Sequence, residues 1–345
     1  MPKGSAINQL NFPSFCDQVG ALGGKAGFWS DPSSPNSHYF NSGVCRTRNG
    51  LVVARRNTHI NSGSLTRDWR QNASHIDFFE LDHSTMELRS LLSLNQQLGD
   101  FFVNIEDPRL VPTEDGLEVW CVKWSTDTSR TMIRQCVVAL GPSLEVRGVD
   151  FPNFGGNDGS LYEKNWGPFD QGRFFVYSSD PNHVVVNRET GESWVTPGLA
   201  VSRPDTMHGG TPPLDLGDRY LCIPQSSAAS QTHNMGGISI GSRWYRVWAY
   251  TFEKKPPFRI LEVSRQPILV GSLGNPCFEG SPASIFPGGL VKLRANELLL
   301  VAGINDYKTG WAVFGVSQIL RFLEPFSASE SLGRIACKSL PTNKA

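Results

Sequence analysis

The pattern that decides the fold first reads Phe40-Asn-Ser-Gly-Val-Cys-Arg-Thr-Arg-Asn-Gly-Leu-Val-Val-Ala-Arg-Arg56. A Gly- or Pro-containing tripeptide is followed by an apolar residue, a polar turn and a hydrophobic run that ends in polar groups. The same order returns four more times along the 345-residue chain, at 105–120, 163–177, 208–222 and 286–301. A strand–turn–strand unit that repeats every few tens of residues is typical of radial β architecture. The sequence therefore predicts an all-β fold, a five-bladed β-propeller.

The repeats also set the domain organisation. Copies that begin 45 to 78 residues apart suit four-stranded blades with variable loops, and they leave no room for a second domain. We expect a propeller over 36–325, an N-terminal extension over 1–35 and a C-terminal tail over 326–345. Both ends are rich in Gly, Ser, Pro and Lys, so they are expected to lie on the propeller or to stay mobile.

Short hydrophobic runs predict strands almost everywhere. Those at 51–54, 117–122, 174–177, 244–252 and 298–302 are bounded by Gly, Asn, Asp and Pro. Residues 83–98 fit either one short helix or a strand followed by a loop, and the sequence does not decide between them.

Composition limits the partners. Lys plus Arg and Asp plus Glu both number 32, so no net charge draws the protein to nucleic acid or to an anionic membrane. We expect an oligosaccharide or glycan substrate, no nucleic acid and no membrane partner. A homo-oligomer is left open, because the Trp-rich stretch 243–248 suits a core or an interface.

Compartment and redox state follow from the N-terminus and the cysteines. The first ten residues lack the apolar core of a signal peptide, and no stretch approaches a membrane span, so a cytoplasmic location is expected. Seven scattered cysteines with no C-x-x-C pair favour buried free thiols, with one or two disulfides as the alternative. No metal site is predicted, because His59, His75 and His233 show no ligand spacing.

The sharpest chemistry lies in Glu106-Asp107-Pro108-Arg109. Alternation along a strand puts Asp107 and Arg109 on one face and Glu106 on the other. Pro108 cannot donate to a sheet ladder, so the stretch reads as the start or edge of a strand. A carboxylate fixed there suits a general acid, and the alternative interpretation is an ion pair that stabilises a loop.

Five motifs together resemble glycoside hydrolase family 130. In chain order they are Glu106-Asp107-Pro108-Arg109, Glu163-Lys164-Asn165-Trp166, Gly209-Gly210-Thr211-Pro212-Pro213, Tyr245-Arg246 and Gly303-Ile304-Asn305-Asp306. Each is short, but the order holds from about residue 38 to 315. The resemblance implies a five-bladed propeller that cleaves β-mannosides, in most members by phosphorolysis.

The resemblance also implies roles for single residues. Asp107 corresponds to the general acid that protonates the glycosidic oxygen while phosphate attacks the anomeric carbon from the opposite face. Such an enzyme needs one catalytic carboxylate, because phosphate replaces the water and base of an inverting hydrolase. Lys164 and Tyr245 correspond to phosphate-binding positions. The expected substrate-binding residues are Asn41, Arg55, Glu106, Arg109, Asn165, His208, Tyr245 and Asp306, with Arg56 as the alternative to Arg55.

Departures from the family bear on the reaction. The family's Tyr-His-Gly, whose His contacts phosphate, is replaced by Ile223-Pro224-Gln225. In the family a pair of arginines completes the phosphate pocket, and the arginines near that position in this sequence are Arg130, Arg134 and Arg147. His208 also stands where the family has a small residue or Arg. It could replace the lost ligand, bind a sugar hydroxyl or simply form a turn.

Three classes of function stay open. A phosphorylase needs inorganic phosphate as co-substrate and no other cofactor, whereas an inverting hydrolase needs a base such as Glu279, Asp205 or Asp306 opposite Asp107. A glycosyltransferase would use an activated sugar donor, and a non-catalytic propeller would only bind glycan. Trp166, Trp244 and Trp311 are candidate sugar-stacking platforms in every class.

Overall fold

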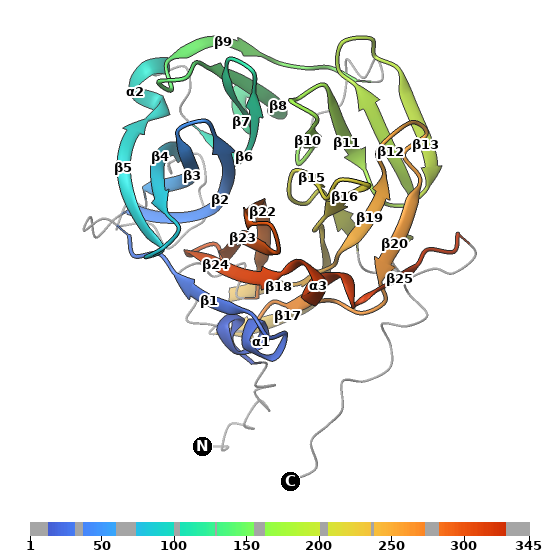
Figure 1. Cartoon of the computed structure of the whole chain (residues 1–345). Helices are drawn as coiled ribbons and strands as arrows, with labels where there is room; N and C mark the ends of the chain where they lie inside the picture. Colours follow the sequence, from blue (N-terminus) through green and yellow to red (C-terminus); the bar gives the residue numbers. More distant parts are fainter. Residues whose placement is uncertain are drawn as a thin grey trace, which may run out of the picture.

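A computed structural model describes residues 13–31, 37–59, 74–99, 104–127, 130–154, 163–200, 206–235, 238–272 and 283–328. Its architecture is all-β, with antiparallel sheets set around a common centre (Figure 1). Within these residues no helix is long and apolar enough to cross a membrane. The closed five-bladed arrangement stays a prediction.

Two sheets come from the first half of the chain. The first contains β2 (Ser37–Thr47), β3 (Gly50–His59), β4 (Ser74–Asp82) and β5 (Glu87–Ser93) in that order. The second contains β6 (Ile105–Thr113), β7 (Gly116–Asp127), β8 (Arg130–Leu140) and β9 (Val146–Asp150). Each is a meander in which sequential strands pair, as the repeated hairpin pattern predicts.

Two further four-stranded sheets follow the same plan. One contains β10 (Gly167–Phe169), β11 (Phe174–Ser178), β12 (Asn182–Asn187) and β13 (Ser193–Pro197). The other contains β22 (Ile285–Arg294), β23 (Glu297–Ile304) and β24 (Lys308–Gly315), and its fourth strand is β1 (Lys25–Phe28) from the other end of the chain. Part of the expected N-terminal extension therefore belongs to a sheet, because β1 pairs antiparallel with β24.

The strands between β13 and β22 divide into two sheets. One is β15 (Leu214–Asp215), β16 (Arg219–Cys222), β19 (Tyr250–Glu253), β20 (Ile260–Ser264) and β25 (Leu323–Pro325). The other is β14 (Thr206–His208), β17 (Gln225–Met235), β18 (Ile238–Val247) and β21 (Leu269–Val270), which the sequence does not foresee. The described helices are α1 (Phe15–Ala21), α2 (Leu94–Leu98) and α3 (Val316–Leu320).

Glycines let the inner strands approach closely. A Cβ on Gly43 of β2 would lie 2.6 Å from the carbonyl oxygen of Pro108 in β6, and one on Gly288 of β22 would lie 2.2 Å from that of Ser42. Both positions are closed to any larger residue without a shift of backbone. Strands β22, β2 and β6 are therefore neighbours near the centre, where Figure 1 also shows them.

Apolar layers fill the space between sheets. Ile76 and Phe78 of β4 pack with Val119 of β7 and Val138 of β8, all fully buried, so the β2–β5 and β6–β9 sheets share one core. Burying side chains of this size stabilises the fold by roughly 1.5–3 kcal/mol each. This packing fixes how the strands that carry the site lie relative to each other.

Most strand predictions are confirmed, with two refinements. The run 244–252 is split, because β18 ends at Val247 and β19 begins at Tyr250 as the chain passes from one sheet to the next. The undecided stretch 83–98 forms β5 followed by the short helix α2. The five described cysteines are free thiols, and four of them, all except Cys16, are buried.

Candidate active site

Two polar residues on neighbouring inner strands occupy β-bulges. The ladder between β2 and β3 shifts at Asn41, and the ladder between β6 and β7 shifts at Asp107 and Pro108. Asn41 and Asp107 both have positive φ, 45° and 55°, a region that Asn and Asp tolerate better than most residues. Bulges re-aim a side chain out of its strand's alternation, and strained residues of this kind gather at functional sites.

Asp107 is held by one of its two carboxylate oxygens. Its Oδ1 accepts a hydrogen bond from Asn41 Nδ2 at 2.9 Å and another from Arg56 Nη1 at 3.3 Å. Among the described residues Oδ2 has no hydrogen-bond partner, and the side chain is 13% exposed. The carboxyl group is therefore fixed in orientation through one oxygen, and its other oxygen has no hydrogen-bond partner among the described residues.

Arg56 joins Asp107 to a second acid. Its Nη2 donates to Glu106 Oε1 at 2.5 Å, and Glu106 also accepts from Ser74 Oγ at 3.4 Å. Burial raises the pKa of Glu106, while the Arg56 cation opposes that shift. For Arg56 burial opposes the charge, but Glu106, Asp107 and Asp306 outweigh it and raise its pKa. Arg56 is therefore a permanent cation at the candidate acid.

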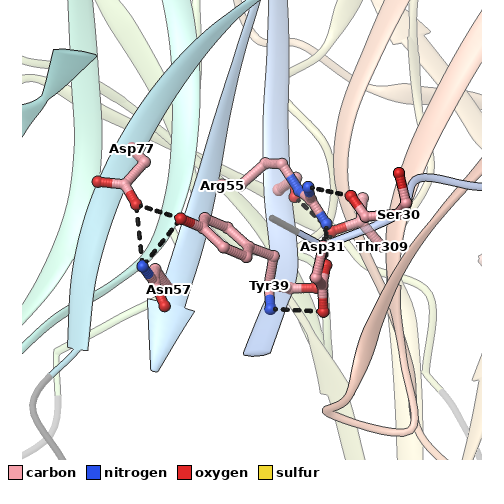
Figure 2. A network of polar contacts seen from close by, with 8 residues as sticks. Ser30, Asp31, Tyr39, Arg55, Asn57, Asp77 and Thr309 are labelled. Atoms are coloured by element: carbon pink, nitrogen blue, oxygen red, sulfur yellow. Dashed lines mark hydrogen bonds and ion pairs between the residues drawn. The ribbon is translucent and has the colours of Figure 1, made fainter. Parts of the chain in front are cut away.

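Arg55, the predicted sugar ligand, lies elsewhere. Successive residues of a strand face opposite sides, and Arg55 faces the β22–β24 sheet, where it pairs with Asp31 at 2.8 Å (Figure 2). It is fully buried, with its charge already matched. The prediction of Arg55 is corrected: the alternative, Arg56, is the arginine that reaches Asp107.

Arg109 is buried in the centre of the fold. Its Nε donates to the Gly210 carbonyl at 2.8 Å, its Nη1 donates to the Asp107 carbonyl at 3.3 Å, and its guanidinium lies over the Phe286 ring at 5.2 Å. Burial lowers its pKa to about 10, so it stays charged at neutral pH. Arg109 therefore ties β6 to Gly210 and to Phe286 of β22, and its Nη2 has no hydrogen-bond partner among the described residues.

Three more predicted residues lie around this cluster. Lys164 is exposed, and its charge acts on Glu106. Asp306 follows β23, and its charge acts on Arg56. Asn165 is buried, has φ of 68° and packs against Gly209. The structure thus gathers Asn41, Arg56, Glu106, Asp107, Lys164 and Asp306 from separate parts of the chain.

Other predicted residues are not placed at this cluster. Tyr245 is on β18, half-buried against the core that contains Val247 and Leu269. His208 pairs with Gln225 through the backbone, and its side chain lies outside the described part of the structure. The alternative bases Glu279 and Asp205 also lie outside the described residues.

The aromatic platforms receive a correction. Trp166 is 1% exposed and stacks on Phe175 with ring centroids 4.5 Å apart, so it is a core residue and cannot stack on a sugar in this structure. Trp311 is half-buried, with its ring against Gly27 of β1.

A cavity of about 530 Å³ lies at the far end of β6 from Asp107, lined by Thr47, Gly50 and Thr113 among others.

Comparison with solved structures shows the fold. No protein-family model and no curated protein matches the sequence. A structure from the GH130 family of mannoside phosphorylases, which contains glycoside hydrolases that target β-1,2 mannosidic linkages in Candida mannan, has a TM-score of 0.58 at 14% identity, covering 94% of this chain and 96% of that one.

Two Leishmania mexicana enzymes are also similar. A mannose phosphorylase, solved with a phosphate ion, has a TM-score of 0.56 at 14% identity and covers 89% of this chain and 91% of its own. A GDP-Man-dependent mannosyltransferase has a TM-score of 0.53 at 14% identity and covers 84% and 89%. The structural neighbours of this chain are thus members of the family that the motifs resemble.

Proposed function

We propose that this protein is a carbohydrate-active enzyme that cleaves or transfers β-linked mannosyl units with inversion, and that Asp107 is its general acid. The observation that carries the proposal is the Asp107 carboxyl group, fixed through Oδ1 by Asn41 and Arg56, while Oδ2 has no hydrogen-bond partner in the described part of the chain. Structural likeness to mannoside phosphorylases, hydrolases and a mannosyltransferase supports the same class.

The chemistry follows from that geometry. Oδ2 of Asp107 carries the proton and delivers it to the glycosidic oxygen as the bond to the anomeric carbon breaks. Arg56 and Asn41 stabilise the carboxylate that remains, so charge that develops on Asp107 meets donors already in place. Asp306 and the amide of Asn165 are the proposed hydroxyl ligands for the sugar, because carboxylate and amide groups can hydrogen-bond hydroxyls.

The nucleophile enters from the opposite face of the sugar ring. Lys164 is exposed beside Glu106, and a flexible ammonium group suits a phosphate oxygen, so we propose phosphate as the co-substrate. If water is the nucleophile, the proposed base is Asp306, a further carboxylate whose charge acts on Arg56.

The fold is part of the proposal. We take the β2–β5, β6–β9, β10–β13, β15–β25 and β22–β1 sheets as five blades, with the β14–β21 sheet as an addition next to the last two. Bulged or left-handed residues at Asn41, Asp107, Asn165 and Asn305 then lie at one end of the ring.

The test measures release of mannose or mannose-1-phosphate from β-1,2-, β-1,3- and β-1,4-linked manno-oligosaccharides, with and without inorganic phosphate. We expect phosphate-dependent release that Asp107→Asn abolishes. Asp170→Asn is the matched control, because Asp170 also has positive φ, at 50°, but is exposed in the turn after β10.

Each outcome has one meaning. Phosphate-independent release identifies a hydrolase, and turnover only with a nucleotide-activated mannose identifies the transferase. Turnover of none of these substrates, or turnover that survives Asp107→Asn, refutes the proposal.

A further inference from the structure

A buried hydroxyl, that of Thr309 on β24, joins strands β2 and β3 from behind. Thr309 Oγ1 accepts from Arg55 Nε at 3.2 Å, donates to the Tyr39 carbonyl at 3.2 Å and lies 2.9 Å from Ser42 Oγ. Thr309, Arg55 and Ser42 are all 0% exposed. The hydroxyl therefore makes contacts that water cannot replace.

The Arg55 side chain completes this network (Figure 2). Its Nη2 donates to Asp31 Oδ1 at 2.8 Å and its Nη1 donates to the Ser30 carbonyl at 3.4 Å. Its guanidinium lies 4.6 Å from the centre of the Tyr39 ring, while Asp31 also accepts from the Tyr39 backbone N–H at 3.4 Å. Because the guanidinium is planar and is bound on several sides, the Arg55 side chain is held in a single orientation.

The residues pinned by this network are the chain neighbours of the two donors that hold Asp107. Ser42 follows Asn41, and Arg55 precedes Arg56. The register of β2 and β3 pairs Phe40 with Arg56 and Ser42 with Arg55, which leaves Asn41 bulged with no opposite residue. A bulged residue is not located by the ladder, so its neighbours must locate it.

We propose that Thr309 and Arg55 are positioning residues, which hold Asn41 and Arg56 at the distances where both donate to Asp107 Oδ1. This inference rests on the proposed function, in which Asp107 is the proton donor. It assigns Arg55 a role through its neighbour, without contact to substrate. Among the described residues, the charged groups at Asp107 are Arg56 from β3 and Glu106 and Arg109 from β6. Lys164, before β10, acts on Glu106, and Asp306, after β23, acts on Arg56.

The test compares Thr309→Val, which keeps the side-chain shape and removes the hydroxyl, with Thr309→Ser, which keeps the hydroxyl. We expect Thr309→Val to lower kcat by on the order of tenfold with KM within about twofold, since small misplacements of catalytic groups cost this much or more. Thr309→Ser should stay within about twofold of wild type.

A second buried threonine serves as the control for the general effect of removing a buried hydroxyl. Thr251 on β19 is 0% exposed and donates to Glu262 at 2.8 Å, remote from Asp107 in the chain and in a different sheet. Thr251→Val should leave both kcat and KM unchanged. Equal effects of Thr309→Val and Thr251→Val on kcat, or equal kcat values for Thr309→Val and Thr309→Ser, would overturn the proposal.

A structural measurement separates this inference from the function on which it rests. Crystal structures of wild type and Thr309→Val give the distances from Asn41 Nδ2 and Arg56 Nη1 to Asp107 Oδ1, here 2.9 and 3.3 Å. Lengthening of either beyond 3.5 Å supports positioning even if mannosides are not substrates. Unchanged distances overturn the positioning role even if mannosides are substrates.

Discussion

The two faces of β3 carry adjacent arginines in opposite situations. Toward the β22–β24 sheet, Arg55 meets one carboxylate, a hydroxyl, backbone carbonyls and two aromatic rings, and it is fully buried. Toward the β6–β9 sheet, Arg56 is shared by Glu106 and Asp107, and one Asp107 oxygen has no hydrogen-bond partner among the residues that the structure describes. The Arg55 guanidinium is therefore hydrogen-bonded through all three of its nitrogens, whereas a carboxylate oxygen beside Arg56 can still accept or donate a hydrogen bond.

The difference shows how one strand can separate support from chemistry. A polar network with every donor matched stabilises a single arrangement, and an acid that must release a proton needs an oxygen outside any such network. Successive residues of a strand face opposite sides, so Arg55 and Arg56 are adjacent along β3 although their side chains point apart. Contacts that fix Arg55 on one face therefore also limit the movement of Arg56 on the other. Substitutions at the two arginines should therefore have different effects.

The largest effect is expected for Arg55→Gln. It leaves Asp31 without its cation and removes contacts that hold three segments together, so we expect a loss of about 3–5 kcal/mol in the free energy of unfolding. Urea denaturation measures it. Arg89→Gln on the same sheet is the control, because Arg89 is 74% exposed in its pair with Glu80 and should lose under about 1 kcal/mol. Similar losses for both would remove the distinction between the two faces.

A smaller effect, on catalysis, is expected for Arg56→Gln. Removing a cation that stabilises the charge left on Asp107 should lower kcat by on the order of 10²-fold, with a smaller stability loss than Arg55→Gln. Steady-state kinetics on the substrate found for wild type gives the value. If Arg56→Gln kept full kcat and lost as much stability as Arg55→Gln, both faces would be structural.

The smallest effect concerns pH. Burial raises the pKa of Glu106 above its ordinary value of 4.5, so the folded chain holds this proton to higher pH than the unfolded chain does. The stability that Glu106 contributes is therefore complete below about pH 4.5 and is lost as pH rises through the folded pKa. Glu106→Gln cannot titrate, so its free energy of unfolding should rise relative to wild type between pH 4 and 7. A flat or falling difference in parallel urea titrations would contradict the raised pKa.

The sequence predicted the local units well. Hairpins such as β2–β3 and β6–β7 follow from alternating apolar residues around Asn-Gly and Asp-Gly turns. Asp107 was predicted from the Pro that follows it and from the motif it belongs to, and the structure places it in a bulge beside Arg56. Its role as the acid stays a prediction until it is tested.

What the sequence could not give depends on partners distant along the chain. Alternation shows that Arg55 and Arg56 face opposite ways, but which one meets Asp107 is decided by the bulge at Asn41 and by packing against β6. Trp166 carries no mark that separates a sugar platform from a residue stacked on Phe175. The Thr309 hydroxyl could have been suspected only from knowing that β24 lies behind β2.

The pairing of β1 with β24 has a consequence for synthesis. It joins residues 25–28 to residues 310–313, so this contact closes a loop of nearly the whole chain and must be among the slowest to form. While the chain is still being made, Thr309 is missing from behind Arg55. The hydrogen bond between Thr309 and Arg55 therefore forms only after almost the last described strand has emerged, and a chain that ends before β24 lacks it.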